Sequence, residues 1–157
     1  KTGMEAARAD LFQKKICIVT RTERSYPPAV EAVIVLWRVV GMRIVQLDPA
    51  EHDRLTAFSS HLPHLIASAL CHAAKSQGKE IDPVLGNGFR DTTRIAQGDP
   101  SMWVDICLEN REAIRDSLQS FQWILKDFCD RLDSADEAAI RDFLAEAQRW
   151  KKRKRSS

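Results

Sequence analysis

Two histidines three residues apart are the first side chains of this chain that could take part in chemistry. His61 and His64 lie in the segment SSHLPHLIAS, and at helical spacing they face the same side. A zinc site of the HExxH kind needs histidines four apart with a glutamate between them, which this segment lacks. Two interpretations stay open: the pair donates hydrogen bonds to an anionic ligand, or each imidazole is a core group bonded to a carbonyl.

A second cluster, GNGFRDTTRIAQGDPSMW at residues 86–103, gathers arginine, aspartate and threonine behind a glycine-containing turn. Arg94 can form two parallel bonds to a carboxylate or phosphate, and Asp91 can orient it or cap the turn. The hydroxyls of Thr92 and Thr93 would add donors. The cluster is either an acid-binding site or an arginine–aspartate pair that pins a loop. Its glycines spell neither GxGxxG nor a phosphate loop, so nucleotide binding within this segment is unsupported.

The sequence assigns neither a nucleophile triad nor a metal site. Four cysteines, none in a CxxC pair, fit neither a disulfide framework nor a zinc ribbon, and we expect reduced, mostly buried thiols. They are Cys17, Cys71, Cys107 and Cys129.

The elements that must position these side chains begin with a strand, a helix and a strand. β-branched runs at residues 15–20 and 42–47 predict the strands. Apolar residues at a 3.6-residue period predict the helix between them, with Pro28 in its first turn and Gly41 as its left-handed cap. A parallel pair needs both faces covered, so we expect an N-terminal α/β portion that this chain does not contain.

From Asp48 onward the pattern is helical. Residues 51–76 form one apolar-periodic stretch in which Pro63 removes a backbone donor, and a kink is expected near residues 60–64. We expect His52, near the start of this helix, to be structural or exposed to solvent.

The C-terminal part predicts two long helices. One starts at Asp99 and carries a buried stripe as far as Leu132, and a capping box of Ser134 and Glu137 starts the other. Their apolar faces exceed what roughly 110 residues can hide in one core. An intertwined dimer is one interpretation, and a helical subdomain packed on the absent portion is the other.

Composition and charge exclude some classes of protein. The chain has 157 residues, of which 44% are hydrophobic, so it can bury a core. Its longest apolar run is far shorter than the roughly 20 residues of a membrane span, and with no export signal we expect a cytoplasmic location and no membrane partner. The basic run 151–155 could bind nucleic acid or direct localisation, but a solvated helix end is the commoner case. We assign this run no function and expect no nucleic-acid partner.

Two long blocks resemble a known enzyme family. EHDRLTAFSSHLPHLIASAL (51–70) and GFRDTTRIAQGDPSMWVDICLEN (88–110) resemble the prephenate and arogenate dehydrogenases of tyrosine biosynthesis, and the opening KTGMEAARADLF is similar to the family's segment after its His-Pro motif. The resemblance implies a mainly α chain. Residues 1–49 would be the last strand-helix-strand of an NAD- or NADP-binding Rossmann domain, and residues 50–157 a helical dimerisation and substrate-binding domain.

The resemblance also implies an activity. A hydride would pass from prephenate to NAD or NADP as carbon dioxide departs, giving 4-hydroxyphenylpyruvate. The alternatives are arogenate as substrate or a non-catalytic helical dimerisation module; the GFRDTTR and SHLPH blocks argue against other hydroxy acids. The catalytic histidine and the cofactor loop of the family would lie upstream of Lys1, so the fragment alone should be an inactive homodimer.

Five residues match the family's substrate site. Arg94 would bind a substrate carboxylate, His61 and His64 would line the pocket, and Asp91 would support the loop. Trp103 would lie near the pocket and reach it across the dimer.

Overall fold

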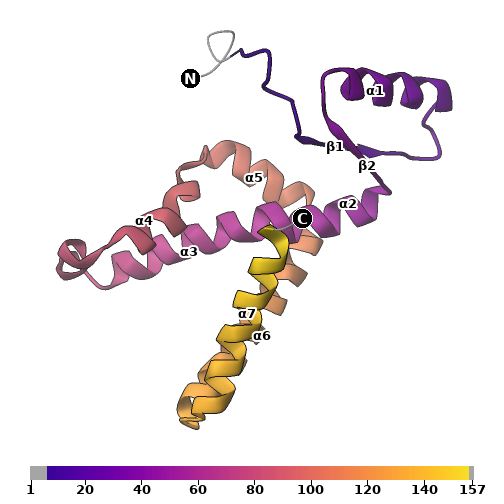
Figure 1. The fold of residues 1–157 in the computed structure, drawn as a ribbon. Helices are drawn as coiled ribbons and strands as arrows, with labels where there is room; N and C mark the ends of the chain where they lie inside the picture. Colours follow the sequence, from indigo (N-terminus) through magenta and orange to yellow (C-terminus); the bar gives the residue numbers. More distant parts are fainter. Residues whose placement is uncertain (1–6, 156–157) are drawn as a thin grey trace. The chain divides into compact units, whose positions relative to one another are not determined.

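The computed structural model describes residues 7–155, so the first half of the opening KTGMEAARADLF block lies outside the described residues. The chain divides into two compact units, and the boundary in the sequence lies between Ala96 and Gln97. The first unit contains the strands and the helices α1 to α4, and the second contains α5 to α7 (Figure 1).

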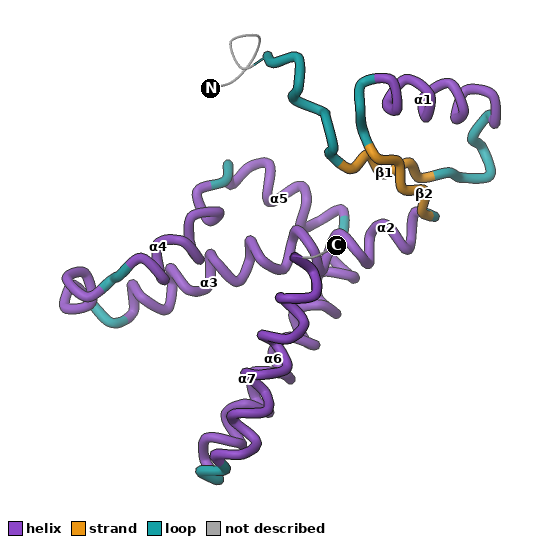
Figure 2. Tube along the Cα trace, in the orientation of Figure 1, coloured by secondary structure: helices purple, strands orange, loops and turns teal. Residues whose placement is uncertain are grey.

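The first unit opens with a parallel strand pair and its crossover helix. These elements are β1 (Ile16–Thr20), α1 (Pro27–Val39) and β2 (Arg43–Leu47), and β1 pairs with β2 in parallel over five residues each. α1 runs alongside the two strands (Figure 2). Ile34, at 1% exposure, is the residue that α1 buries. The predicted strand-helix-strand unit is therefore confirmed.

The end of α1 follows from one glycine. Gly41 has φ +87° and donates to the Arg38 carbonyl at 3.0 Å, while the Met42 amide donates to the Trp37 carbonyl at 3.0 Å. These two bonds form the Schellman motif, which satisfies carbonyls that the last helical turn leaves open. The Gly41 carbonyl then accepts from the Lys14 amide at 2.8 Å, which ties the cap to the segment before β1.

A long helix with one irregular turn follows β2. α2 (Pro49–Thr56) starts at Asp48, whose Oδ1 accepts from the Glu51 amide at 2.9 Å, and α3 (Leu62–Ser76) continues the same helix. Between them, Ala57–His61 form a π-helical turn.

The irregularity differs from the kink predicted near residues 60–64. It is centred on the turn before Pro63, and the Leu62 amide donates to the Ala57 carbonyl five residues back. Pro63 has no amide hydrogen to donate to the carbonyl four residues back, and this loss alone would give a kink. The structure instead inserts one extra residue in the turn, which changes the rotation of everything that follows.

Two short helical segments return the chain along α3. Gly78, at φ +79°, leads into a 3₁₀ segment at Lys79–Val84, and α4 (Asn87–Thr93) then contacts α3 before a second 3₁₀ segment at Arg94–Gln97. The glycine-bearing segment 78–88 is therefore partly helical.

The second unit consists of three helices. They are α5 (Pro100–Glu109), α6 (Arg111–Asp133) and α7 (Glu137–Arg155), and α6 and α7 lie side by side (Figure 2). The prediction of one helix from Asp99 to Leu132 is wrong because Asn110, at φ −115° and ψ 32°, breaks it. Asparagine side chains compete for backbone groups, which makes such a break inexpensive.

The start of α7 also differs from the prediction. Asp136 Oδ1 accepts from the Ala139 amide at 2.9 Å, so Asp136 is the N-cap. Ser134 Oγ instead donates to the Arg131 carbonyl at 3.1 Å, at the end of α6. Ala135, at φ +50°, ends α6 in the left-handed conformation and moves the helix start beyond Ser134.

Much of the apolar surface of α6 is uncovered within the chain. The rings of Phe128 and Phe143 pack with centroids 4.8 Å apart between α6 and α7. Trp123, however, is 70% exposed, and the predicted stripe residues Leu125 and Leu132 are about half exposed rather than buried. An apolar face of this size is typical of a surface that another protein covers.

The cysteines are more accessible than expected. Cys17, Cys71 and Cys107 are half-buried and Cys129 is exposed, so the expectation of mostly buried thiols is wrong. Among residues 7–155, no helix is long and apolar enough to span a bilayer.

The Gly41 cap generates a stability prediction. Alanine at this position would have to adopt the left-handed backbone conformation of Gly41, and its Cβ would lie 3.3 Å from Gln13 Cγ. Gly41→Ala should therefore lower the free energy of unfolding by about 1–2 kcal/mol. Urea unfolding measures this change. Gly88→Ala is the matched control because an added Cβ there meets nothing within 4 Å, and its unfolding midpoint should not fall. Equal losses in the two variants would contradict the role given to Gly41.

Candidate functional site

The two predicted histidines lie at the junction of the π turn and α3. His64 is 8% exposed in the first turn of α3, and His61 is half-buried at the end of the π turn. Burial is the largest cause that lowers the pKa of each imidazole. Both rings are therefore neutral at neutral pH, and each can donate one hydrogen bond and accept another.

A third histidine, His52, belongs to the same region. Its Nδ1 donates to Asp53 Oδ1 at 2.9 Å, which orients the ring. After burial, the positive charge of His52 is the next cause that lowers the pKa of His61, and the Asp53 carboxylate raises it. The sequence predicts a structural or solvent-exposed His52, and these electrostatic effects add that it lies near His61.

The π turn explains why the sequence did not reveal this grouping. In a regular α-helix each residue advances by about 100°, so residues 52 and 61 would lie about 180° apart, on opposite sides. One inserted residue reduces the angle between residues 52 and 61, measured around the helix axis, to about 80°. It also brings residues 52 and 64 to within about 20° of each other, on the same face. A helical turn that precedes a proline is the sequence signal for such an insertion, and the same signal also predicts a simple kink.

The threonines of the second cluster use their hydroxyls locally. Thr92 Oγ1 donates to the Gly88 carbonyl and Thr93 Oγ1 to the Phe89 carbonyl, each at 2.8 Å. Thr93 is also 9% exposed. Their hydroxyl protons satisfy α4 itself, so the expectation that they add donors for a ligand is wrong in this conformation.

Arg94 and Asp91 do not pin a loop by pairing. Both side chains are exposed, and neither forms an ion pair or side-chain hydrogen bond with any other residue in the part of the chain that the structure describes. The five N–H donors of the Arg94 guanidinium are thus available to an anion, with the fork geometry that suits a carboxylate. Of the two interpretations drawn from the sequence, this arrangement favours the acid-binding one.

The helices that carry these groups adjoin in the first unit. α4, which ends just before Arg94, contacts α3, which carries His64 (Figure 1). Trp103 lies in the first turn of α5, in the second unit, and is half-buried. Its approach to the other four residues stays a prediction.

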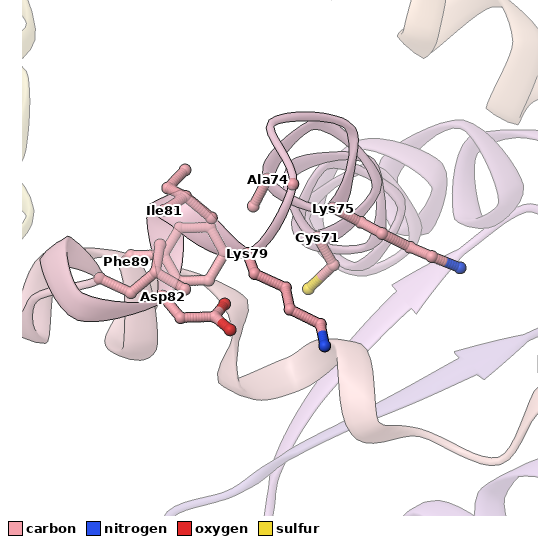
Figure 3. Close-up of a pocket in the computed structure, with 9 residues that line it drawn as sticks. Cys71, Ala74, Lys75, Lys79, Ile81, Asp82 and Phe89 are labelled. Carbon is pink, nitrogen blue, oxygen red and sulfur yellow. The ribbon is translucent and has the colours of Figure 1, made fainter.

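A hollow of about 410 Å³ lies at the other end of α3 (Figure 3). It is lined by apolar residues, which include Ile81 and Phe89, and by Cys71, Lys79 and Asp82. None of the five predicted site residues lines it, so this hollow is distinct from the candidate site.

A second hollow, of about 270 Å³, adjoins the carboxyl ends of the strands. It is lined by Arg21, Gln46, Leu47 and Asp48, immediately after β1 and at the end of β2. The carboxyl edge of a parallel sheet is where open α/β folds bind their ligands. Among the described residues, no group of three or more potential metal ligands lies together.

Comparison with known proteins identifies the family. The sequence profile described as "Prephenate dehydrogenase, dimerization domain" matches residues 48–146. The helical part is thus of a kind found in an oxidoreductase family, as a domain that joins subunits. The chain belongs to the prephenate dehydrogenase family.

Individual relatives agree with this assignment. Prephenate dehydrogenase of Bacillus subtilis is 35% identical over 128 residues, which are 79% of this chain and 34% of that protein. Cyclohexadienyl dehydrogenase of Zymomonas mobilis is 32% identical over 151 residues, 94% of this chain and 52% of that protein. The chain therefore spans between a third and about half of the length of these relatives.

A solved structure matches nearly the whole chain. The crystal structure of prephenate dehydrogenase from A. aeolicus, in complex with hydroxyphenyl propionate and NAD+, has a TM-score of 0.91 and 31% identity. The match covers 98% of this chain and 55% of the chain in that crystal structure. The mainly helical fold with a short parallel sheet at its start, as predicted from the sequence, is confirmed.

The histidine grouping generates opposite predictions for two substitutions. His52→Gln removes a positive charge and should raise the pKa of His61, whereas Asp53→Asn removes a negative charge and should lower it. Titration of the imidazole resonances by NMR measures both. Substitution of the exposed His72 by Gln is the control and should leave the pKa of His61 unchanged. Shifts of the same sign in the first two variants would contradict the placement of His52.

Proposed function

We propose that this chain is the C-terminal part of an NAD(P)-dependent prephenate dehydrogenase. The observation that carries the proposal is the agreement, over 98% of the chain, with an enzyme bound to NAD+ and hydroxyphenyl propionate. We further propose that residues 1–49 complete a dinucleotide-binding domain and that residues 50–157 form the substrate and dimerisation domain. The start of the family match at residue 48 supports this boundary.

The charges of the candidate site suit a dicarboxylate. Prephenate carries two carboxylates, and Arg94 offers a permanent cation with paired donors. His61 and His64, kept neutral by burial, would donate hydrogen bonds without adding charge. In this proposal His52 lies at the edge of the same site, and Trp103 reaches the substrate from the partner subunit.

The proposed reaction is an oxidative decarboxylation. A hydride leaves the carbinol carbon, the ring carboxylate departs as carbon dioxide, and the ring becomes aromatic. NAD(P)+ supplies the hydride acceptor when it is bound. The residues of this chain would bind and orient the substrate so that these two bonds break together, and a histidine outside the chain would hydrogen-bond the ring hydroxyl. We therefore propose that this segment alone is inactive.

The chain contributes only an edge to the proposed cofactor site. The hollow at the carboxyl ends of β1 and β2 fits the border of a dinucleotide site, because the carboxyl edge is where such sheets bind nucleotides. The sequence contains no glycine-rich phosphate loop. NAD or NADP would thus be held mainly by a domain outside the chain.

The proposed assembly is a homodimer. The exposed apolar face of α6, with Trp123 70% and Ile124 39% exposed, is the surface that a second copy would cover. The dimerization-domain match supports this assembly. The proposed activity acts on a small molecule and requires no membrane, which suits an enzyme of the cytoplasm.

Turnover by the full-length protein tests the proposed function. Each of NAD+ and NADP+ is supplied with prephenate and, in parallel, with arogenate, because a relative with another name, cyclohexadienyl dehydrogenase, also matches. Reduced cofactor measured at 340 nm should appear with prephenate. Turnover with arogenate but not with prephenate would show that the substrate is arogenate. A folded dimer that binds cofactor and turns over neither substrate would favour a non-catalytic dimerisation module.

Arg94 generates a kinetic prediction. Arg94→Ala should lower kcat/KM by about 10- to 100-fold, mainly through KM, because one charge-assisted pair is worth about 1.5–3 kcal/mol. Arg90→Ala, which removes an exposed arginine one turn earlier on α4, is the matched control and should change kcat/KM less than threefold. Because Arg94 is exposed, the urea midpoint should not change. Equal effects of the two substitutions would remove Arg94 from the site.

A further inference from the structure

The end of α7 carries a dense positive charge. Residues 149–155 read RWKKRKR, so six of seven are basic, and α7 continues as a helix through Arg155. The side chains described in this run are exposed. The family match ends at residue 146, so this run lies beyond the segment that the family shares. Neither the proposed activity nor the proposed dimer surface uses it.

The cations surround the helix on every side. With about 100° per residue, Arg149 and Arg153 lie about 40° apart, Lys151 lies about 160° from Arg153, and Lys152 lies between them on the remaining side. Trp150 is the single apolar residue of the run, and Lys154 Nζ lies 6.0 Å from its ring centroid. This end of α7 is therefore a helix with basic side chains on all sides and no apolar face.

The helix dipole accounts for only part of this charge. Cations stabilise a helix C-terminus within its last turn, whereas Arg149 and Lys151 precede that turn. Like charges three and four residues apart, such as those of Arg149 and Arg153, repel each other and destabilise the helix. A ligand with closely spaced negative charges would remove this repulsion.

We propose that the basic end of α7 binds the phosphate backbone of nucleic acid. A helix is about 10–12 Å in diameter and the major groove of B-DNA is about 12 Å wide, so a helix charged all round meets phosphates on both walls. A membrane surface would instead favour cations on one face and apolar residues on the other. From the sequence alone, nucleic-acid binding is one possible role of this run, and a solvated helix end is the commoner case. The continuous helix and its all-round charge are what the structure adds.

Binding of a labelled duplex by the full-length protein tests this proposal. The probe is a fluorescein-labelled 20-base-pair DNA of mixed sequence, titrated at several salt concentrations and followed by anisotropy. The test variant changes Lys151, Lys152, Arg153 and Lys154 to Gln, which keeps helix propensity. The control variant changes Arg111, Arg115, Lys126 and Arg141 to Gln, which removes the same charge from dispersed positions on α6 and α7.

The proposal expects binding that weakens steeply with salt. Each lost phosphate contact lowers the slope of log K against log salt by about 0.9, so the test variant should lose about 3 to 4 and bind at least tenfold more weakly at 50 mM salt. The control variant should keep the wild-type slope within about 1. Equal slopes in the test variant and the wild type would overturn the proposal. So would stronger binding to vesicles with 30% phosphatidylserine than to the duplex. Prephenate turnover by the test variant reports separately on the proposed function.

Discussion

The geometry of the candidate site depends on one backbone constraint, the change to i−5 hydrogen bonding in the turn from Ala57 to His61. A wider turn has poorer packing along its axis, so its surroundings must hold it in place. Ala57, which is fully buried, and Leu62, at 3% exposure, enclose the two ends of that turn. Because one helix carries residues on both sides of the turn, this insertion decides which of them share a face.

Electrostatics divides the site into two kinds of group. The histidines are held neutral by burial, whereas the guanidinium of Arg94 is a cation that pairs with none of the described residues. A site built in this way supplies one fixed cation and several neutral donors. It therefore distinguishes ligands by where their negative charge lies, and not by total charge alone. Such an arrangement is consistent with a substrate whose carboxylates lie at opposite ends.

Features encoded by neighbouring residues were predictable from the sequence. Gly41 and Asp48 were found because a left-handed cap and an N-cap each depend on a few adjacent residues. The helix boundaries near Asn110 and Ser134 were predicted wrongly, because several residues near each position could end or start a helix. The sequence does not show which of them takes the required backbone conformation. In the candidate site, His61, His64 and Arg94 stay predictions from residue type, spacing and family resemblance. The sequence did not indicate that His52 lies near His61, because that position depends on a one-residue change in the helical repeat, which no local composition reveals.

The burial of His64 has a consequence for proton linkage. Its pKa in the folded chain is lowered from the usual 6.5, so the unfolded chain binds protons more readily than the folded one. The stability that neutral His64 contributes is complete above pH 6.5 and is lost as the pH falls through the folded-state pKa. An anion bound beside this ring would favour its protonated form and oppose that loss. The domain is thus most sensitive to mild acid when its site is empty.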